Sequence, residues 1–393
     1  MSVNRSRVLV VAVIGCWVAW GSTAAADWVG CQAKPTRECL LDEALRGDHG
    51  PLVGKDRLDF IIQTDYRNHP EYLTAADIDE AKRQVASQAG PSTASRYYYF
   101  SLAATGLIAA KRVQEAFDLI PNLEVGWRVS ALDQMTVALI NANALDEVPI
   151  FGRPMLADPR SIFDIAVKTL AGKDKIEQAL AFMALNPAVR PAQKEMFEAV
   201  GAAYAVRGDA KMAARFYDKA QSEVEMLAPS AVQDDAAMEL RFDQMILRAL
   251  RGDTDGVKAA LKEMPAVSDK PADRVEIKRN LGYQKLIAFL LRVDHPEVAL
   301  DIASSAPGRY RASNLLIVGL WDAQHHRLDE ANKILLSLGD NVDPKIRGIM
   351  LRGLAIAKAK SGDLSSAVAL ASQSSDPIRR RAILFEVAQT LPQ

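Results

Sequence analysis

The sequence predicts an all-α protein made of stacked antiparallel helix pairs, and three observations lead to this fold class. In residues 197–220, large and small apolar residues recur at helical spacing on both sides of a Gly208-Asp209 turn. Neither helix of this unit can bury its apolar stripe alone, and weaker copies of the unit occur along the chain. The composition agrees, because 49% hydrophobic but only 6% aromatic residues favour closely packed helices over strands.

Residues 1–26 are predicted to be a cleaved export signal. Two arginines precede an apolar run of about a dozen residues, and a stretch of alanines ending at Ala26 suits cleavage before Asp27. The run is shorter than the ~20 residues that span a bilayer. We therefore expect a mature chain without a transmembrane segment, located in the periplasm or secreted. Lipidation at Cys16, in a loose lipobox pattern, is the alternative.

Residues 27–91 are predicted to form a helical N-terminal cap that carries a disulfide. Cys31 and Cys39 remain after cleavage, and in an oxidising compartment two such cysteines pair. Closing so short a loop stabilises the fold by about 2–3 kcal/mol in the chain-entropy model. A metal or redox site is the weaker alternative, because two thiols make a poor metal site and the spacing is not Cys-x-x-Cys.

Residues 92–375 are predicted to form the repeat array, in which each unit is a first helix, a tight turn and a shorter second helix. Glycine at the turn ends the first helix in a left-handed conformation, and the aspartate after it accepts the free amides that begin the second helix. The turns read Gly172-Lys173-Asp174, Gly208-Asp209, Gly252-Asp253, Val293-Asp294 and Gly362-Asp363.

Residues 376–393 are predicted to form a C-terminal capping helix. Asp376-Pro377 repeats a helix-start signal that also occurs at Asp158-Pro159 and Asp343-Pro344, in which an N-cap aspartate precedes a proline at the first helical position. Because no second helix follows, we expect this last helix to face solvent at the end of the array.

The repeat at residues 197–220 resembles the tetratricopeptide repeat family. With the turn glycine of that repeat placed at Gly208, its packing positions hold Phe197, Val200, Gly201, Tyr204, Ala213, Tyr217 and Ala220. Partial copies hold Leu315, Val318, Gly319 and Ala331, and then Leu351, Leu354, Ala355 and Ala367. The resemblance covers roughly residues 92–393 and implies a degenerate right-handed α-solenoid that acts as a protein-binding scaffold.

The sequence contains none of the usual catalytic motifs. There is no Gly-rich phosphate loop, nucleophile elbow or His-Glu-x-x-His zinc helix. The one histidine pair, His325-His326, occupies adjacent helical positions about 100° apart, from which two rings rarely reach one metal. We therefore expect no enzyme, no catalytic residue, no metal and no cofactor. With 48 Lys+Arg against 49 Asp+Glu, we also expect no nucleic-acid partner.

The family resemblance implies a binding groove on the concave face lined by first helices. It places the candidate partner-binding residues at Glu195, Glu198, Arg279, Lys285, Arg311, Leu316, Leu320, Arg352 and Lys360. The later part of this face is rich in basic residues, which suits an acidic peptide or a carboxylate terminus, although an ordinary solvated face explains it equally well. We expect a periplasmic scaffold or adaptor that binds a protein or peptide partner. The alternative is the helical platform of a glycan- or peptidoglycan-acting envelope enzyme, or an outer-membrane-attached assembly factor.

Overall fold

The structure is a computed structural model that describes residues 28, 30–47, 50–63, 70–87, 92–148, 160–185, 190–225, 233–264, 274–339 and 342–392. The predicted export signal and Cys16 lie outside the described residues. The prediction of an all-α fold is confirmed. Within the described part of the chain, β structure is confined to two-residue strands, β1 (Arg46–Gly47) and β2 (Gly50–Pro51), which pair antiparallel.

The helices follow one another along the chain. In the first half they are α2 (Arg37–Ala44), α3 (Gly54–Gln63), α4 (Ala75–Ala86), α5 (Thr93–Ala109), α6 (Val113–Asp118), α7 (Val125–Asn141), α8 (Arg160–Gly172), α9 (Ile176–Ala184), α10 (Arg190–Val206) and α11 (Ala210–Glu225). In the second half they are α12 (Gln233–Leu250), α13 (Thr254–Lys262), α14 (Arg274–Arg292), α15 (Pro296–Ser305), α16 (Gly308–Gln324), α17 (Leu328–Leu338), α18 (Pro344–Lys360), α19 (Leu364–Ser372) and α20 (Pro377–Gln389). Short 3-10 turns span Pro70–Tyr72, Ile120–Asn122 and Leu145–Glu147.

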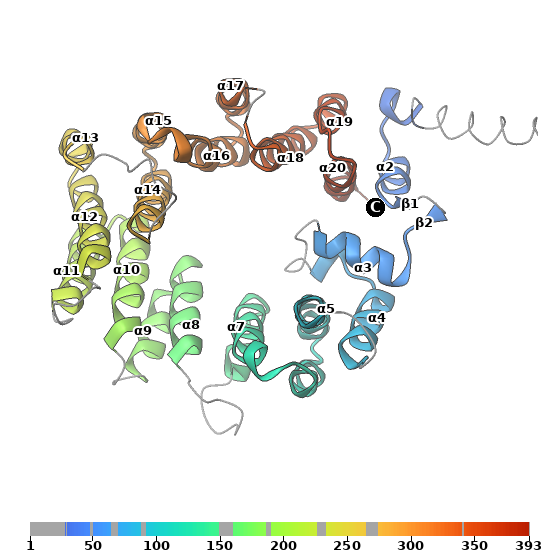
Figure 1. Ribbon diagram of the computed structural model, residues 1–393, viewed down its shortest axis with the longest axis horizontal. Coiled ribbons are helices and arrows are strands. Elements are labelled where there is room, and N and C mark those ends of the chain that lie inside the picture. The colour runs from blue at the N-terminus through green and yellow to red at the C-terminus, as the bar shows by residue number, and fades with distance from the viewer. Residues whose placement is uncertain are drawn as a thin grey trace, which may run out of the picture. The chain divides into compact units, whose positions relative to one another are not determined.

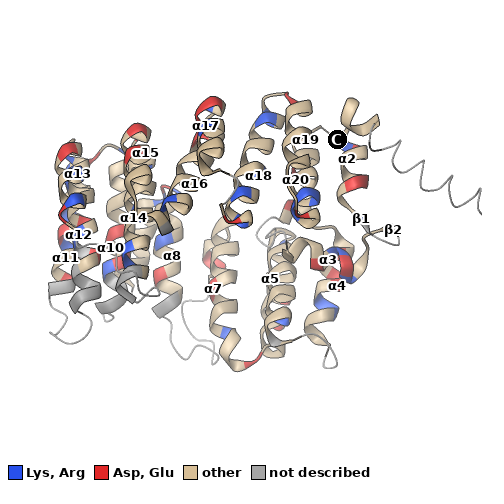
Figure 2. Ribbon diagram, turned by 45° about the horizontal axis from the view of Figure 1, so that its top comes forward, with Lys and Arg blue, Asp and Glu red and all other residues tan. Residues whose placement is uncertain are grey.

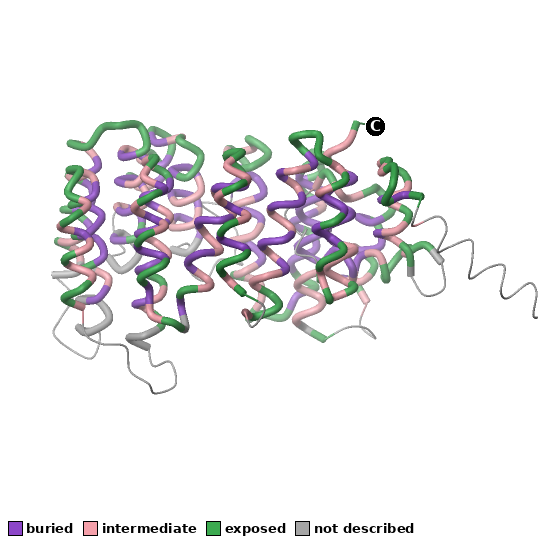
Figure 3. The backbone as a smooth tube through the Cα atoms, turned by 90° about the horizontal axis from the view of Figure 1, so that it is seen from above, coloured by how far each residue is buried: buried purple, intermediate pink, exposed green. Residues whose placement is uncertain are grey.

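Long and short helices alternate and pack as consecutive pairs (Figure 1). The paired helices are α5 with α6, α8 with α9, α10 with α11, α12 with α13, α14 with α15, and α18 with α19. First helices also pack on their neighbours, α7 on α8, α8 on α10, and α12 on α14. Buried residues lie between helices and exposed residues gather at the turns, as Figure 3 shows. The right-handed sense of a superhelix stays a prediction.

Among the described residues, the turns that follow eight of the longer helices each contain one residue in the left-handed region. These residues are Lys111, Asn143, Asp174, Gly208, Gly252, Asp294, His326 and Gly362. At the three glycines the sequence prediction is confirmed, because a left-handed residue ends the first helix as expected. The aspartates that follow them also act as predicted, accepting the amide hydrogens of Met212, Gly256 and Ser366. Acidic residues at the beginnings of α13, α15 and α17 are red in Figure 2.

At two turns the predicted chemistry was wrong. Asp174 and Asp294 adopt φ values of 61° and 60°, so each aspartate occupies the left-handed position itself instead of capping the next helix. Gly172 is the last residue of α8. The reason is local: aspartate is one of the few residues whose short polar side chain tolerates this conformation, so it can replace glycine there.

Close approach of two first helices depends on Gly282. A Cβ atom added to Gly282 on α14 would lie 2.1 Å from the Phe242 ring on α12, and the Phe242 ring is fully buried. We expect Gly282→Ala to destabilise the protein by about 1–3 kcal/mol through overpacking. The control is Gly126→Ala on α7, where an added Cβ meets no atom. Urea unfolding followed by circular dichroism compares them, and equal stability of the two variants would contradict this packing.

The described residues divide into two compact units. Unit 1 combines the residues up to Leu52 with those from Gly319 onward, and unit 2 is Val53–Val318. The predicted N-terminal cap of residues 27–91 is therefore split, since α2 belongs to unit 1 and α3 to unit 2. Within unit 2, Tyr99 on α5 donates a hydrogen bond of 2.5 Å to Asp59 on α3.

The C-terminal helix does not face solvent as predicted, because α2 packs against it within unit 1 (Figure 1). Seven consecutive residues of α20, from Ala382 to Ala388, are buried. Arg381 donates a hydrogen bond of 2.8 Å to the carbonyl oxygen of Arg46. Sequence alone shows that α20 has an apolar face but cannot show that its partner precedes it by more than 300 residues.

The predicted disulfide is confirmed. Cys31 and Cys39 are bonded, with Cα atoms 5.8 Å apart, and Cys39 lies in α2, whose first turn is capped by the Thr36 side chain. The bond therefore links the segment before α2 to the helix that packs on α20. No helix in the described part of the chain is long and apolar enough to span a bilayer.

Candidate functional site

A groove of about 440 Å³ lies in unit 2 along the first helices α8, α10, α12 and α14. Its apolar lining consists of Ala199, Ala202, Tyr217, Phe242, Ile246, Leu281, Gly282, Ala288 and Phe289. Its charged lining consists of Lys168, Lys194, Glu195, Glu198, Glu239, Lys278, Lys285 and Arg292. Among the lining residues, five basic side chains thus face three acidic ones. The groove therefore combines an apolar surface with an excess of positive charge.

Five charged residues form one ionic cluster at the floor of this groove: Lys194 and Glu198 on α10, Glu239 and Asp243 on α12, and Lys285 on α14. Lys194 Nζ lies 2.5 Å from Glu198 Oε1, 2.9 Å from Glu239 Oε2 and 3.6 Å from Asp243 Oδ2. Lys285 Nζ lies 2.7 Å from Glu198 Oε2 and 2.5 Å from Asp243 Oδ1. Each ammonium thus bridges carboxylates from two helices.

Helical spacing places these charges on facing surfaces. Lys194 and Glu198 are four residues apart, as are Glu239 and Asp243, so each pair lies on one side of its helix. Lys278 and Lys285 are seven residues apart on α14, which again puts both on one side. When α10, α12 and α14 pack side by side, the three charged surfaces meet in the ionic cluster.

Burial and neighbouring charges drive the pKa values of the two most buried carboxyls apart. Burial, together with the neighbouring Glu198 charge, raises the pKa of Asp243 to about 7 against the lowering effects of Lys285 and Lys194. Burial also disfavours the charged form of Glu198, but the ammonium groups of Lys285 and Lys194 outweigh it and lower the pKa of Glu198 to about 2. At neutral pH Glu198 is ionised, whereas Asp243 holds a proton more readily than an ordinary aspartate does.

The two lysines of the ionic cluster stay charged. Burial alone lowers the pKa of Lys194, but the carboxylates of Asp243 and Glu198 outweigh it, so its pKa is raised. The same two carboxylates raise the pKa of Lys285 against burial. Tyr217, fully buried beside the cluster, has a pKa well above its usual value because of burial and because of the nearby Asp243 and Glu198 charges.

The rim of the groove is also charged. Lys168 pairs with Glu195 and lies 2.7 Å from Asp164 Oδ2, while Lys278 pairs with Glu239. Arg292 differs from these lysines, since it forms no ion pair with the residues that the structure describes and its side chain is exposed. Leu281, 50% exposed, adds an apolar side chain to the same wall of α14. Both are available to a ligand.

Three of the sequence-predicted binding residues come together in the groove: Glu195, Glu198 and Lys285. Arg279 was wrongly predicted to be accessible, because it is only 3% exposed. Arg279 is also not among the residues that line the groove, although Lys278 beside it is.

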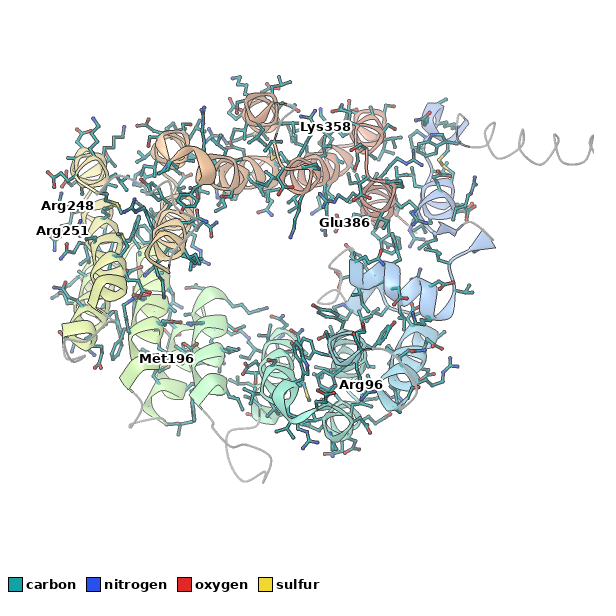
Figure 4. The ribbon with its side chains drawn as sticks, in the orientation of Figure 1. Arg96, Met196, Arg248, Arg251, Lys358 and Glu386 are labelled. Atoms are coloured by element: carbon teal, nitrogen blue, oxygen red, sulfur yellow. A yellow bond between two sulfur atoms is a disulfide. The ribbon has the colours of Figure 1, made fainter. Side chains whose placement is uncertain are left out.

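The remaining predicted residues do not line this groove. Arg352 forms a two-bonded ion pair of 2.6 and 2.7 Å with the buried Glu386 of α20, labelled in Figure 4, so its guanidinium has a structural partner. Leu320 lies against Gly353 of α18, and Leu316 is half-buried. Arg311 and Lys360 are exposed, and nothing in the structure tests whether they bind a partner.

Sequence reasoning missed most of the ionic cluster. It overlooked Lys194, Glu239 and Asp243, and the rim residues Lys168, Lys278 and Arg292. The sequence feature that could have indicated the cluster is the i, i+4 spacing of Lys194 with Glu198 and of Glu239 with Asp243. The same spacing is equally typical of ion pairs on a solvated helix surface. Only the packing of α10 against α12 and α14 shows that these charges are buried together.

Comparisons with known proteins do not identify a function for the groove. No family model matches the chain, and no curated protein matches it. Among solved structures, the chain is similar to the crystal structure of Ton1535 from Thermococcus onnurineus NA1, with 12% identity, 86% of this chain and 99% of that chain covered, and a TM-score of 0.26. A likeness this weak carries no argument about function.

Proposed function

We propose that the protein is a non-enzymatic scaffold or adaptor that binds an acidic, partly apolar segment of a protein partner in the groove along α8, α10, α12 and α14. The observation that carries this proposal is the lining of the groove, where five basic residues and three acidic ones accompany apolar side chains. Repeats of helix pairs commonly present such extended binding surfaces. An apolar anchor provides affinity and complementary charge selects the partner.

The compartment of this activity is proposed to be the periplasm or the exterior of the cell. The Cys31–Cys39 disulfide supports an oxidising environment. The basic and apolar pattern of residues 1–26 supports export.

A charge reversal at the rim tests the proposal. We expect Arg292→Glu to weaken binding of an acidic, leucine-containing peptide by about tenfold or more, because a like charge replaces a cation that has no ion-pair partner in the described structure. Arg251→Glu is the matched control, since Arg251 is exposed at the turn after α12 and does not line the groove. Fluorescence anisotropy at low salt measures both.

Two results would contradict this proposal. If both variants bind the acidic peptide as the unchanged protein does, or if a lysine- and leucine-containing peptide binds as well, the groove does not select acidic segments. Photo-crosslinking from position 281 in cells gives a second measure. It should yield discrete adducts with acidic segments that are missing when the crosslinker stands at the exposed Leu336 of α17.

One observation favours the alternative of a glycan-acting enzyme. Carboxyls whose pKa values are pushed apart, as for Glu198 and Asp243, are typical of acid and base pairs. Against this reading, the Asp243 side chain is only 2% exposed and does not line the groove. Glycan turnover that is abolished by Glu198→Gln would establish the enzymatic function instead.

A further inference from the structure

We propose that the groove takes up a proton, shared between Glu198 and Asp243, together with each anionic group that it binds. This inference rests on the proposed function, because it describes how the same groove responds to an acidic ligand. The groove then binds two ligands at one site: a carboxylate-bearing segment at the groove surface and a proton on the carboxyls buried beneath that surface.

Two oxygens of the ionic cluster lack a hydrogen-bond donor. Glu198 Oε1 and Asp243 Oδ2 are both buried and have no hydrogen-bond partner among the described residues. Lys194 Nζ lies near both, at 2.5 and 3.6 Å, but its contacts are ion pairs without the alignment of a hydrogen bond. Lys194 Nζ and Lys285 Nζ each contact both carboxyl groups, so the two carboxyls lie side by side. A proton on one of them supplies a donor that this pair lacks.

The charge balance of the ionic cluster links the proton to the bound anion. Asp243 faces Lys194 and Glu198 from α10, Lys285 from α14 and Tyr217 from α11, with Glu239 one turn away on its own helix. Lys278 pairs with Glu239 from the rim, so three carboxylates face three ammonium groups and the charges balance when every group is ionised. One proton between Glu198 and Asp243 therefore leaves one positive charge, which a bound carboxylate neutralises in this poorly solvated site.

Anion binding and proton binding then reinforce each other. A carboxylate bound near Lys194, Lys285 and Arg292 adds negative charge beside the two buried carboxyls, which makes ionisation of Asp243 less favourable. By linkage, a proton on Asp243 strengthens anion binding by the same factor. The lining is then left with uncompensated positive charge facing the ligand.

The pH range follows from the direction of the shift. Because burial raises the pKa of Asp243 to about 7, the proton is bound below that pH and lost above it. Affinity for an acidic ligand is therefore high and constant in mildly acidic solution and falls as the pH rises through 7. In the bound state the pKa of Asp243 is higher still, so the decrease in affinity continues above pH 7.

The test uses the full mature chain and a fluorescein-labelled octapeptide of alternating leucine and glutamate. Anisotropy is measured from about pH 5.5 to about pH 8.5, where the glutamates of the peptide stay ionised. We expect affinity to fall by up to about tenfold per pH unit above 7. Calorimetry in buffers of different ionisation enthalpy should show uptake of a fraction of a proton, at most one, per peptide bound.

Asp243→Asn separates the proton from the other causes of a pH effect, since the amide has the shape of the protonated acid. We expect this variant to bind the peptide with the low-pH affinity of the unchanged protein at every pH. Asp301→Asn is the matched control, because Asp301 pairs with Lys258 at an exposed site outside the groove, and it should keep the full pH dependence.

The outcomes distinguish this inference from the proposed function. If the peptide binds with a flat pH profile, or if Asp243→Asn retains the profile, proton uptake is wrong while the binding function stands. If the peptide binds at no pH, the proposed function fails, and carboxyl NMR of the free protein decides the proton site. One of the two carboxyls should then hold a proton up to about pH 7, and complete ionisation of both by about pH 5 would overturn the inference.

Discussion

Replacing Lys194 with methionine is expected to destabilise unit 2 by about 3 kcal/mol at neutral pH and above. Lys194 is buried and lies within ion-pair distance of Glu198, Glu239 and Asp243. Methionine fills a similar volume but leaves the carboxylates of the ionic cluster with one ammonium fewer. The cost therefore comes from uncompensated buried charge and not from a cavity.

The pH dependence of this variant identifies that cause. Without Lys194, the carboxyls of Glu198 and Asp243 have higher pKa values, because the ammonium group stabilises their ionised forms. Below these pKa values the carboxyls are protonated and need no partner, so the loss should shrink as the pH falls toward about 5. Urea unfolding at several pH values measures it. Lys258→Met is the control, since it removes an exposed pair with Asp301 and should change stability little. Equal stability of the two variants would contradict a buried ionic cluster.

Replacing Leu40 with alanine is expected to weaken the packing of α2 on α20 by about 2–4 kcal/mol. Leu40 lies on α2 and is 0% exposed, and α20 is the main packing partner of that helix. Hydrogen exchange should show faster exchange in α2 and in the buried stretch of α20, while amides of unit 2 change less.

A matched leucine provides the control for this result. Leu336 on α17 also belongs to unit 1 but is 79% exposed, so Leu336→Ala should leave the exchange of α2 unchanged. Reduction of the Cys31–Cys39 bond should act in the same direction as Leu40→Ala, because the disulfide restricts the segment that bears α2. If Leu40→Ala exchanges like Leu336→Ala, α2 does not stabilise the C-terminal helix.

Local features of the fold were predictable from the sequence because neighbouring residues determine them. The turns at Gly208, Gly252 and Gly362 depend on a left-handed residue and an aspartate cap within one turn of chain. The disulfide could be inferred from the pair of cysteines that remains after residue 26. The two failures, Asp174 and Asp294, arose because aspartate fits both the left-handed position and the cap.

Contacts between distant segments were not predictable in the same way. The charges of Glu198 and Lys285 were expected at a groove, but their burial beside Asp243 depends on how closely α10, α12 and α14 pack. Likewise, the apolar face of α20 called for a partner, and nothing in its own residues distinguishes solvent from α2. The apolar periodicity of a helix predicts which face is buried, but it does not predict which segment packs against that face.

The sequence by itself determined that this chain folds into paired helices, where most of the pairs turn, and which cysteines are joined, because these properties depend on short-range backbone conformation and on residue type. Only the tertiary structure decided that α2 packs on the last helix and that Lys194, Glu198, Asp243 and Lys285 meet in one ionic cluster. The physical reason is that burial and charge pairing depend on distances in space, and the periodicity of one helix does not contain the position of another.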